Sequence, residues 1–252
     1  MLVTNTGLTT QVLLGASVNV YSNPKACFLN KCALFGGMWN DLCTSQHNPT
    51  VGNWNEFDWF AGIQFTIAKN WSFSTQYIAF LSPPGNFKTE QNIEFSLSYD
   101  DSAFKLPIVL NPYIKFFLAV AGDSTVVVGK RGGTYDIEIG INPTLKLKQY
   151  ALTLSLPTWV TVGPAAFWNG GTLGLKDVKN KNCGVFSTGF KGIANLGIPK
   201  SYGNWYVDAG IQYYYLINRN LMQAQTVTLQ LSSINSAHRS VAVAYLGFGS
   251  QF

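Results

Sequence analysis

The sequence has few charged residues and no long apolar run. Charged side chains make up 12% of its 252 residues, about half of the roughly 25% that is usual in soluble globular domains. The most apolar stretch, residues 106–122, is interrupted by Asn111, Pro112 and Lys115. A transmembrane helix of about 20 apolar residues is therefore excluded. A chain of such low polarity can still cross a bilayer as a closed β-barrel, which also satisfies its backbone hydrogen bonds internally.

Catalytic and nucleic-acid-binding motifs are also missing. The two histidines, His47 and His238, stand in no recognisable spacing with a nucleophile or with an acid such as Asp41. The segment GKRGG at 129–133 lacks the frame of a phosphate-binding loop, and no basic stripe with a recognition motif is present. We predict that the chain is not an enzyme, uses no cofactor and binds no nucleic acid. A hydrolase site in the loops, built on His47 or His238, is kept as an alternative that ranks below the two functions given at the end of this section.

The four cysteines, Cys27, Cys32, Cys43 and Cys183, suit an oxidising compartment such as the periplasm or the cell surface. Three of them fall within the first predicted long loop. We therefore expect two disulfides that staple this loop, with three connectivities open. A zinc site made of Cys27, Cys32, Cys43 and His47 is the alternative, but its spacing is unlike that of a zinc finger. We predict no metal.

Period-two alternation of apolar and polar residues, the pattern of β-strands, is abundant. In residues 7–21, for example, Val12 and Leu14 share one face, while Gln11 and Ser17 share the other. About ten segments follow this pattern: 7–21, 56–67, 71–81, 89–99, 110–118, 134–142, 150–162, 184–196, 205–217 and 240–252.

The predicted connections alternate in length. Short ones fall near 68–70, 100–106, 143–148 and 198–204, and longer ones near 22–53, 120–131, 163–182 and 218–238, with a shorter one at 82–88. This alternation, an even strand number and termini on the short-turn side are typical of bacterial outer-membrane barrels. We predict an all-β fold, a single antiparallel up-and-down transmembrane β-barrel over residues 1–252. It has about 10 strands, or 12 if 124–129 and 226–231 also form strands.

A soluble β-sandwich would show the same alternation. Its outer faces would carry many Lys and Glu residues, whereas the polar faces here carry mostly Ser, Thr, Gln, Asn and Gly. The composition therefore favours a barrel whose apolar face meets lipid.

The chain ends on SVAVAYLGFGSQF, in which Ala244, Leu246, Phe248 and Phe252 share one face. This ending resembles the C-terminal signature of bacterial outer-membrane proteins, whose last strand is recognised by the barrel assembly machinery. The resemblance implies that Phe248 and Phe252 form the assembly signal. In the first half, WNEFDWFAGIQF, QYIAFLSPPGNF and EFSLSYDDS also resemble the TorF-type proteobacterial porins, and no catalytic residues carry over. The first residues, MLVTNTG, do not form a signal peptide, and we expect that a leader has been removed.

Charges on the polar faces of the predicted strands are mostly acidic. If the apolar faces point outward, these carboxylates line a narrow lumen, where low-dielectric walls would concentrate cations. The alternative is a plugged lumen, because about ten strands enclose little space and Glu–Lys networks with Tyr and Gln could fill it. The predicted lumen and selectivity residues are Glu56, Asp58, Glu90, Glu94, Asp136, Glu138 and Asp208, balanced by Lys115 and Lys191.

These patterns predict a porin-like channel in the bacterial outer membrane that passes small polar or cationic solutes through a narrow acidic lumen. The alternative is a closed barrel that serves as a structural or binding platform through disulfide-stapled outer loops. Expected partners are outer-membrane lipid, lipopolysaccharide, the barrel assembly machinery and small solutes. A monomer is the default, and a homo-oligomer such as a trimer is also compatible with the flat aromatic outer faces. Residues expected to form aromatic girdles at the membrane surfaces are Trp59, Trp71, Tyr77, Tyr99, Tyr135, Trp205, Tyr213, Tyr215 and Phe252.

Overall fold

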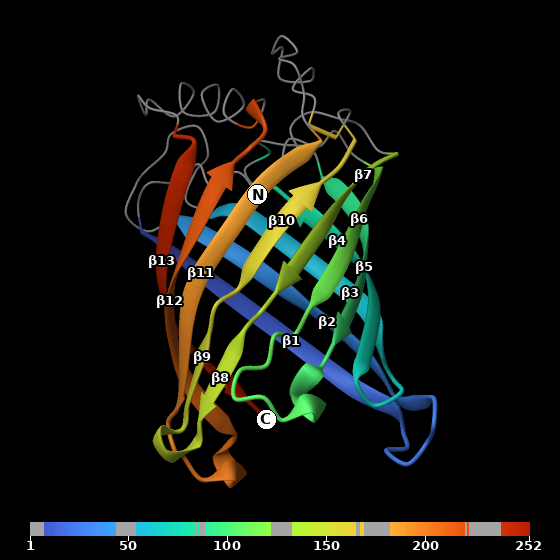
Figure 1. The fold of residues 1–252 in the computed structure, drawn as a ribbon. Helices are drawn as coiled ribbons and strands as arrows, with labels where there is room; N and C mark the ends of the chain where they lie inside the picture. Colours follow the sequence, from blue (N-terminus) through green and yellow to red (C-terminus); the bar gives the residue numbers. More distant parts are fainter. Residues whose placement is uncertain are drawn as a thin grey trace.

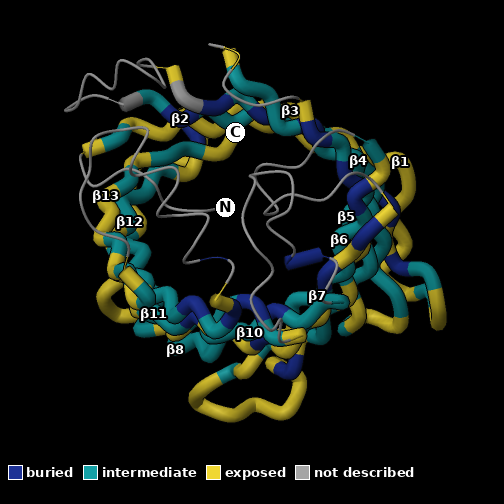
Figure 2. The backbone as a smooth tube through the Cα atoms, turned by 90° about the horizontal axis from the view of Figure 1, so that it is seen from above, coloured by how far each residue is buried: buried dark blue, intermediate teal, exposed yellow. Residues whose placement is uncertain are grey.

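The fold is one antiparallel sheet of 13 strands that curls into a ring (Figures 1 and 2). The computed structural model describes residues 8–43, 54–83, 85, 89–121, 133–164, 167–168, 182–219, 221 and 238–252, without the side chains of Cys43 and Asn55. Among these residues, no helix is long and apolar enough to cross a membrane.

Each strand of the main path pairs antiparallel with its neighbours along the chain. A short hairpin of β8 (Thr144–Leu147) and β9 (Leu152–Ser155) extends β7 and β10. Pro143 and Pro157 mark the two breaks, because proline cannot donate to the ladder. The main path consists of β1 (Thr9–Ser22), β2 (Leu29–Cys43), β3 (Trp54–Ile67), β4 (Trp71–Leu81), β5 (Glu90–Tyr99), β6 (Tyr113–Ala121), β7 (Thr134–Ile141), β10 (Thr158–Val162), β11 (Cys183–Asn195), β12 (Asn204–Leu216) and β13 (Ser240–Gln251).

Strand β2 occupies a segment that the sequence predicts to be part of a long loop. Its alternation is obscured because Phe35 and Trp39 lie on the same face as Lys31 and Asp41, and two glycines interrupt the middle of the strand. With β2 included, the main path of the described residues has eleven strands, where the sequence predicts about ten or twelve. The segments 124–129 and 226–231, which the sequence offers as extra strands, lie outside the described residues.

The odd strand number places the first and last strands differently from the prediction. Thr9 of β1 pairs with Cys43, beside the long connection at 44–53. Gln251 of β13 pairs with Asn204, beside the short turn at 196–203. The start of β1 and the end of β13 therefore lie at opposite ends of the sheet, and not both on the short-turn side.

The ring of strands is not closed by hydrogen bonds. Within the described residues, β1 and β13 stand at the two ends of the strand order and do not pair with each other. The antiparallel up-and-down sheet is confirmed, whereas the predicted closed barrel is not found. Because eleven strands of the described residues stand on the path, β1 and β13 run in the same direction and cannot pair antiparallel.

The two faces of the sheet differ in polarity as the alternation predicts. On β13, the outward side chains Leu246 and Phe248 are 79% and 66% exposed. The inward carboxylates Glu90 and Asp136 are buried. We call these the convex and the concave face.

The predicted disulfides are not found. Cys27, Cys32 and Cys183 are free thiols. Cys27 and Cys32 lie at the short-turn end of β1 and β2, whereas Cys183 begins β11 at the long-connection end. A strand rises about 3.3 Å per residue, so β2 separates Cys32 from Cys43 by far more than the roughly 7 Å between Cα atoms that a disulfide tolerates. Much of the loop that these bonds were expected to staple is strand β2 (Leu29–Cys43).

Inward aromatic rings lie over glycines of the neighbouring strand. Phe35 of β2 covers Gly62 of β3, and Phe60 of β3 covers Gly37 of β2. Their rings lie 6.4 Å apart. The same contact recurs where Tyr113 covers Gly140. The missing Cβ atoms let bulky side chains lie flat against the concave wall, a known device for curving and registering sheets.

We expect Gly62→Ala to lower the free energy of unfolding by about 1–3 kcal/mol, the usual cost of overpacking. A Cβ at Gly62 would lie 2.7 Å from Cζ of Phe35 and against the backbone oxygen of Thr75, which cannot rotate away. The control is Gly192→Ala, where the nearest atom, Cδ2 of Leu154, would be 3.6 Å from the new Cβ. Urea titration of both variants in detergent micelles would measure the difference; equal stabilities would contradict the packing described above.

The turn between β5 and β6 is held by two aspartates. Asp100 accepts a hydrogen bond from the backbone N–H of Ser102 and caps the short helix η1 (Asp101–Phe104). The carboxylate of Asp101 accepts the N–H groups of Leu110 at 2.9 Å and Asn111 at 2.8 Å. Hydrogen bonds from Ser102 hold the pKa of Asp100 below its usual range, and those from Asn111 and Leu110 do so for Asp101.

We expect Asp101→Asn to be less stable than the wild type at neutral pH, because one amide oxygen cannot replace two carboxylate oxygens. A carboxyl whose pKa is lowered on folding stabilises the fold above its unfolded pKa of about 4 and loses that contribution as pH falls through the folded pKa. The difference between variant and wild type should therefore shrink in acid. Denaturant unfolding at several pH values would show this, with Asp100→Asn, which keeps a capping side chain, as the control.

Candidate functional site

All the lumen residues predicted from the sequence lie on strands at concave-face positions. Their environments differ along the strand direction. Carboxylates near the long connections are buried against one another, while carboxylates nearer the short turns pair with lysines. Glu94 of β5 lies directly opposite Gln76 of β4 and is hydrogen-bonded to it.

Four buried carboxylates of the concave face form an acidic cluster, defined here as Asp41, Glu56, Asp58 and Glu90. Glu56 lies opposite Asp41 in the β2–β3 ladder, and Asp58 occupies the next position on the same face of β3. Glu90, only 1% exposed, accepts a hydrogen bond of 2.9 Å from the amide of Asn92. The cluster lies toward the long-connection ends of β2, β3 and β5. Asp136, near the same end of β7, is also buried.

Asp41 is a member of this cluster that sequence reasoning missed. The sequence places Asp41 in a loop, because β2 is not recognised as a strand. In the structure Asp41 is 3% exposed and lies directly between Gln11 of β1 and Glu56 of β3. The available signal was the spacing of Asp41 from Trp39 and Lys31, which is even and so consistent with one strand face.

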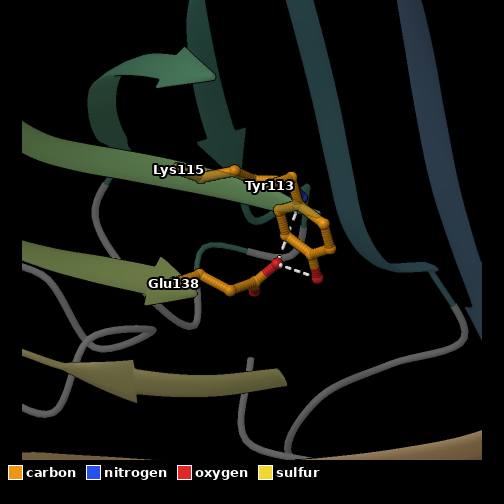
Figure 3. Close-up of polar contacts among 3 residues, drawn as sticks. All are labelled: Tyr113, Lys115 and Glu138. Atoms are coloured by element: carbon orange, nitrogen blue, oxygen red, sulfur yellow. Dashed lines mark hydrogen bonds and ion pairs between the residues drawn. The ribbon is translucent and has the colours of Figure 1, made fainter. Parts of the chain in front are cut away.

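A lysine cluster, Tyr113, Lys115 and Glu138, joins β6 and β7 (Figure 3). Nζ of Lys115 lies 3.4 Å from Oε1 of Glu138, and the hydroxyl of Tyr113 donates a 2.9 Å hydrogen bond to the same oxygen. The ammonium group also lies 5.4 Å from the centre of the Tyr113 ring, within the range of a cation–π interaction. We call this group the first lysine cluster.

The second lysine cluster, Lys191, Asp208 and Tyr245, repeats this arrangement on β11, β12 and β13. Nζ of Lys191 lies 2.9 Å from Oδ2 of Asp208 and 5.7 Å from the centre of the Tyr245 ring. The Tyr245 ring covers Gly210, as the Tyr113 ring covers Gly140. In Figure 2, as in the strand order, only β10 stands between β7 of the first cluster and β11 of the second. Both lysines lie toward the short-turn ends of their strands.

The wall formed by β10, β11 and β12 carries neutral polar and aromatic side chains. The amide of Gln212 donates to the hydroxyl of Ser187 at 2.6 Å, and that hydroxyl donates to the carbonyl of Tyr213 at 2.8 Å. Trp159 and Tyr214 meet edge to face, with ring centres 6.1 Å apart. In its half toward the long connections, the concave surface is thus acidic over β2, β3, β5 and β7 and neutral over β10, β11 and β12, where the charged Lys191 and Asp208 lie nearer the short turns.

A small apolar core lies at the long-connection end of β10, β11 and β12. Phe167 and Trp168 are buried and meet edge to face, with ring centres 4.5 Å apart. The indole of Trp168 lies over Gly184 and donates to the carbonyl of Asn182 at 3.2 Å. Leu216 and Leu221 are buried as well. Residues of the long connections therefore pack against the strand ends there.

Aromatic pairs decorate the convex face near both strand ends. Toward the short turns, Trp71 packs on Tyr99 with ring centres 4.8 Å apart. The Trp205 ring lies 5.2 Å from that of Phe248 and 6.0 Å from that of Phe252. Phe252 remains 92% exposed. Further pairs, toward the long connections, are Trp59 with Tyr77 and Phe116 with Tyr135.

The residues of the metal and histidine alternatives are only partly described. No group of three or more His, Cys, Asp or Glu side chains among the described residues is arranged to hold a metal ion. His238 is exposed at the start of β13. His47 and the side chain of Cys43, which the zinc alternative requires, lie outside the described residues.

Comparisons with known protein families, with curated proteins and with solved structures find no match to this chain.

We expect a coupling free energy of about 0.5–3 kcal/mol between Lys115 and Glu138, the range for residues in direct contact. Lys115→Met, Glu138→Gln and the double variant, unfolded in urea, form the cycle that measures it. The matched control pairs Lys115→Met with Asp208→Asn, because Asp208 is the ion-pair partner of Lys191 in the second lysine cluster, and this cycle should be additive. Additivity within both cycles would show that the first lysine cluster does not form in solution.

Proposed function

We propose that this protein is a channel of the bacterial outer membrane that lets small polar or cationic solutes pass through a narrow acidic lumen. The observation that carries the proposal is the separation of the two faces. The convex face exposes large apolar and aromatic side chains, while the concave face gathers buried carboxylates from β2, β3, β5 and β7.

The dimensions of the strands support a membrane-spanning role. A transmembrane β-strand needs about 9–11 residues at a tilt, and β3, β11 and β12 have 14, 13 and 13. Aromatic pairs near both strand ends correspond to the girdles that border the apolar band of such proteins. Phe248 and Phe252, exposed on the last strand, are proposed as the signal read by the barrel assembly machinery.

The distribution of charge supports a preference for cations. A solute that enters from the long-connection side meets the acidic cluster first, where low-dielectric surroundings strengthen its field. Deeper in, the two lysine clusters place ammonium groups on β6 and β11, three strands apart in the strand order. These ammonium groups repel cations, so the two regions together set the selectivity.

A second candidate is a platform that binds partners through its long connections. The buried Phe167, Trp168, Leu216 and Leu221 favour it, because they give the long-connection end a core of its own. The free thiols of Cys27, Cys32 and Cys183 remove the disulfide staple from this alternative.

Single-channel recording in planar bilayers under a salt gradient tests the channel. We expect steady conductance with cation preference in the wild type. Replacing Glu56, Asp58, Glu90 and Glu94 by their amides should lower the cation-to-anion permeability ratio severalfold, towards 1, because the focused negative field is removed.

Two further variants sharpen this experiment. Lys115→Met with Lys191→Met should raise the permeability ratio, because the repelling ammonium groups are lost. Asp100→Asn, which removes one exposed charge in a turn, should leave the ratio unchanged. A silent bilayer despite a folded protein in the membrane would sink the channel and favour the platform.

A further inference from the structure

The two edges of the sheet lack the features that protect exposed strand edges in soluble proteins. Such edges usually carry lysines, prolines, inward charges or short strands that prevent pairing with another chain. β1 (TTQVLLGASVNVYS) and β13 (SVAVAYLGFGSQ) contain no charged residue and no proline. The one irregularity is a bulge of β1 between Asn19 and Tyr21, next to the turn. Both edges are therefore suited to pair with a further strand.

The two edges also match each other. β1 has 14 residues and β13 has 12, and both run from the long-connection end to the short-turn end. Val12 and Leu14 of β1 and Ala244 and Leu246 of β13 all belong to the convex face. A parallel pairing in a suitable register would continue both faces across the junction without placing an apolar side chain in the lumen.

Gly15 of β1 provides a third, independent observation. The concave-face glycines of β12 and β13 are each covered by a side chain of a neighbouring strand: Gly210 by Tyr245, Gly247 by Asp208 and Gly249 by Tyr206. A Cβ at Gly15 would meet only the backbone oxygen of Gly36, at 3.5 Å. Its partner in β2 is Gly37, which has no side chain to offer. The space over Gly15 is therefore open to a side chain from the other side of β1.

We propose that β1 and β13 pair with each other in parallel when the chain is in the membrane, closing the ring through a parallel seam with a concave-face side chain of β13 over Gly15. This inference rests on the proposed membrane function, because backbone N–H and C=O groups cannot stay unsatisfied in lipid. An antiparallel closure is excluded by the direction of the two strands. The seam needs no additional strand and no second chain.

Cysteine pairs introduced on the convex face test the seam. The starting protein has Cys27, Cys32, Cys43 and Cys183 replaced by serine and is inserted into phospholipid vesicles. Leu14→Cys is combined in turn with Ala242→Cys, Ala244→Cys, Leu246→Cys or Phe248→Cys and treated with a mild oxidant. Non-reducing gels and mass spectrometry identify each cross-link. We expect efficient cross-linking within one chain for one of these pairs, or for two adjacent ones.

A second cysteine pair distinguishes parallel from antiparallel order. When Leu14→Cys is replaced by Val18→Cys, the best partner should move four residues towards the C-terminus of β13. Leu34→Cys with Ile63→Cys, which face each other in the β2–β3 ladder, is the positive control. Leu14→Cys with Ile139→Cys, on opposite parts of the ring, is the negative control.

The outcomes separate the seam from the channel. Cross-links only between two chains would replace the seam by an interface between copies, and their absence despite the positive control would also overturn it. Conductance without the cross-link would contradict the pairing of β1 with β13 but not the channel. A cross-link without any measurable conductance would support the pairing of β1 with β13 and contradict the channel. Failure of the folded chain to insert into vesicles would overturn both.

Discussion

A long antiparallel strand with carboxylates on one face and apolar side chains on the other is stable only if each face finds its own surroundings. In this sheet the pairing of neighbouring strands supplies part of the surroundings that the charged side chains need. Lys115 lies directly opposite Glu138, so the register of β6 and β7 creates the ion pair. Lys191 faces Gly210 and reaches Asp208 diagonally, which the missing side chain of glycine allows. The charges of the concave face are therefore fixed by register, and a slip of one residue would turn them outward.

Curvature of the sheet depends on the pairing of inward rings with glycines. A ring such as Phe35 or Tyr113 needs depth on the concave side, and a glycine of the neighbouring strand provides it. Without these glycines, bulky inward side chains would force neighbouring strands apart or reduce the curvature of the sheet. The same contact positions the Tyr113 and Tyr245 rings beside Lys115 and Lys191. Packing and electrostatics of the concave face thus depend on the same residues.

Sequence reasoning predicts most of this architecture and fails at identifiable places. Clean alternation located strands such as β3, β5 and β12 and assigned Glu56, Glu90 and Asp208 to the polar face. It failed for β2, where inward Phe35 and Trp39 remove the contrast between the faces. Because β2 was not recognised, Asp41 was not assigned to the concave face and one strand was missing from the predicted order. Cys27, Cys32 and Cys43 were also placed together in one loop, although β2 separates Cys32 from Cys43. Ion-pair partners could not be predicted either, because they depend on register, which a single sequence does not determine.

Strand parity has consequences beyond the count. An even number would let the last strand return antiparallel to the first, so that one more hairpin-like ladder closed the ring. With eleven strands on the path, the two edges run the same way, and parallel hydrogen bonds are slightly weaker per residue. The proposed junction of β1 and β13 is therefore weaker per residue than the antiparallel ladders of the sheet. Its strands are uncharged and their convex faces are apolar, so lipid, which offers backbone groups no alternative partner, is the environment in which that ladder is most favourable.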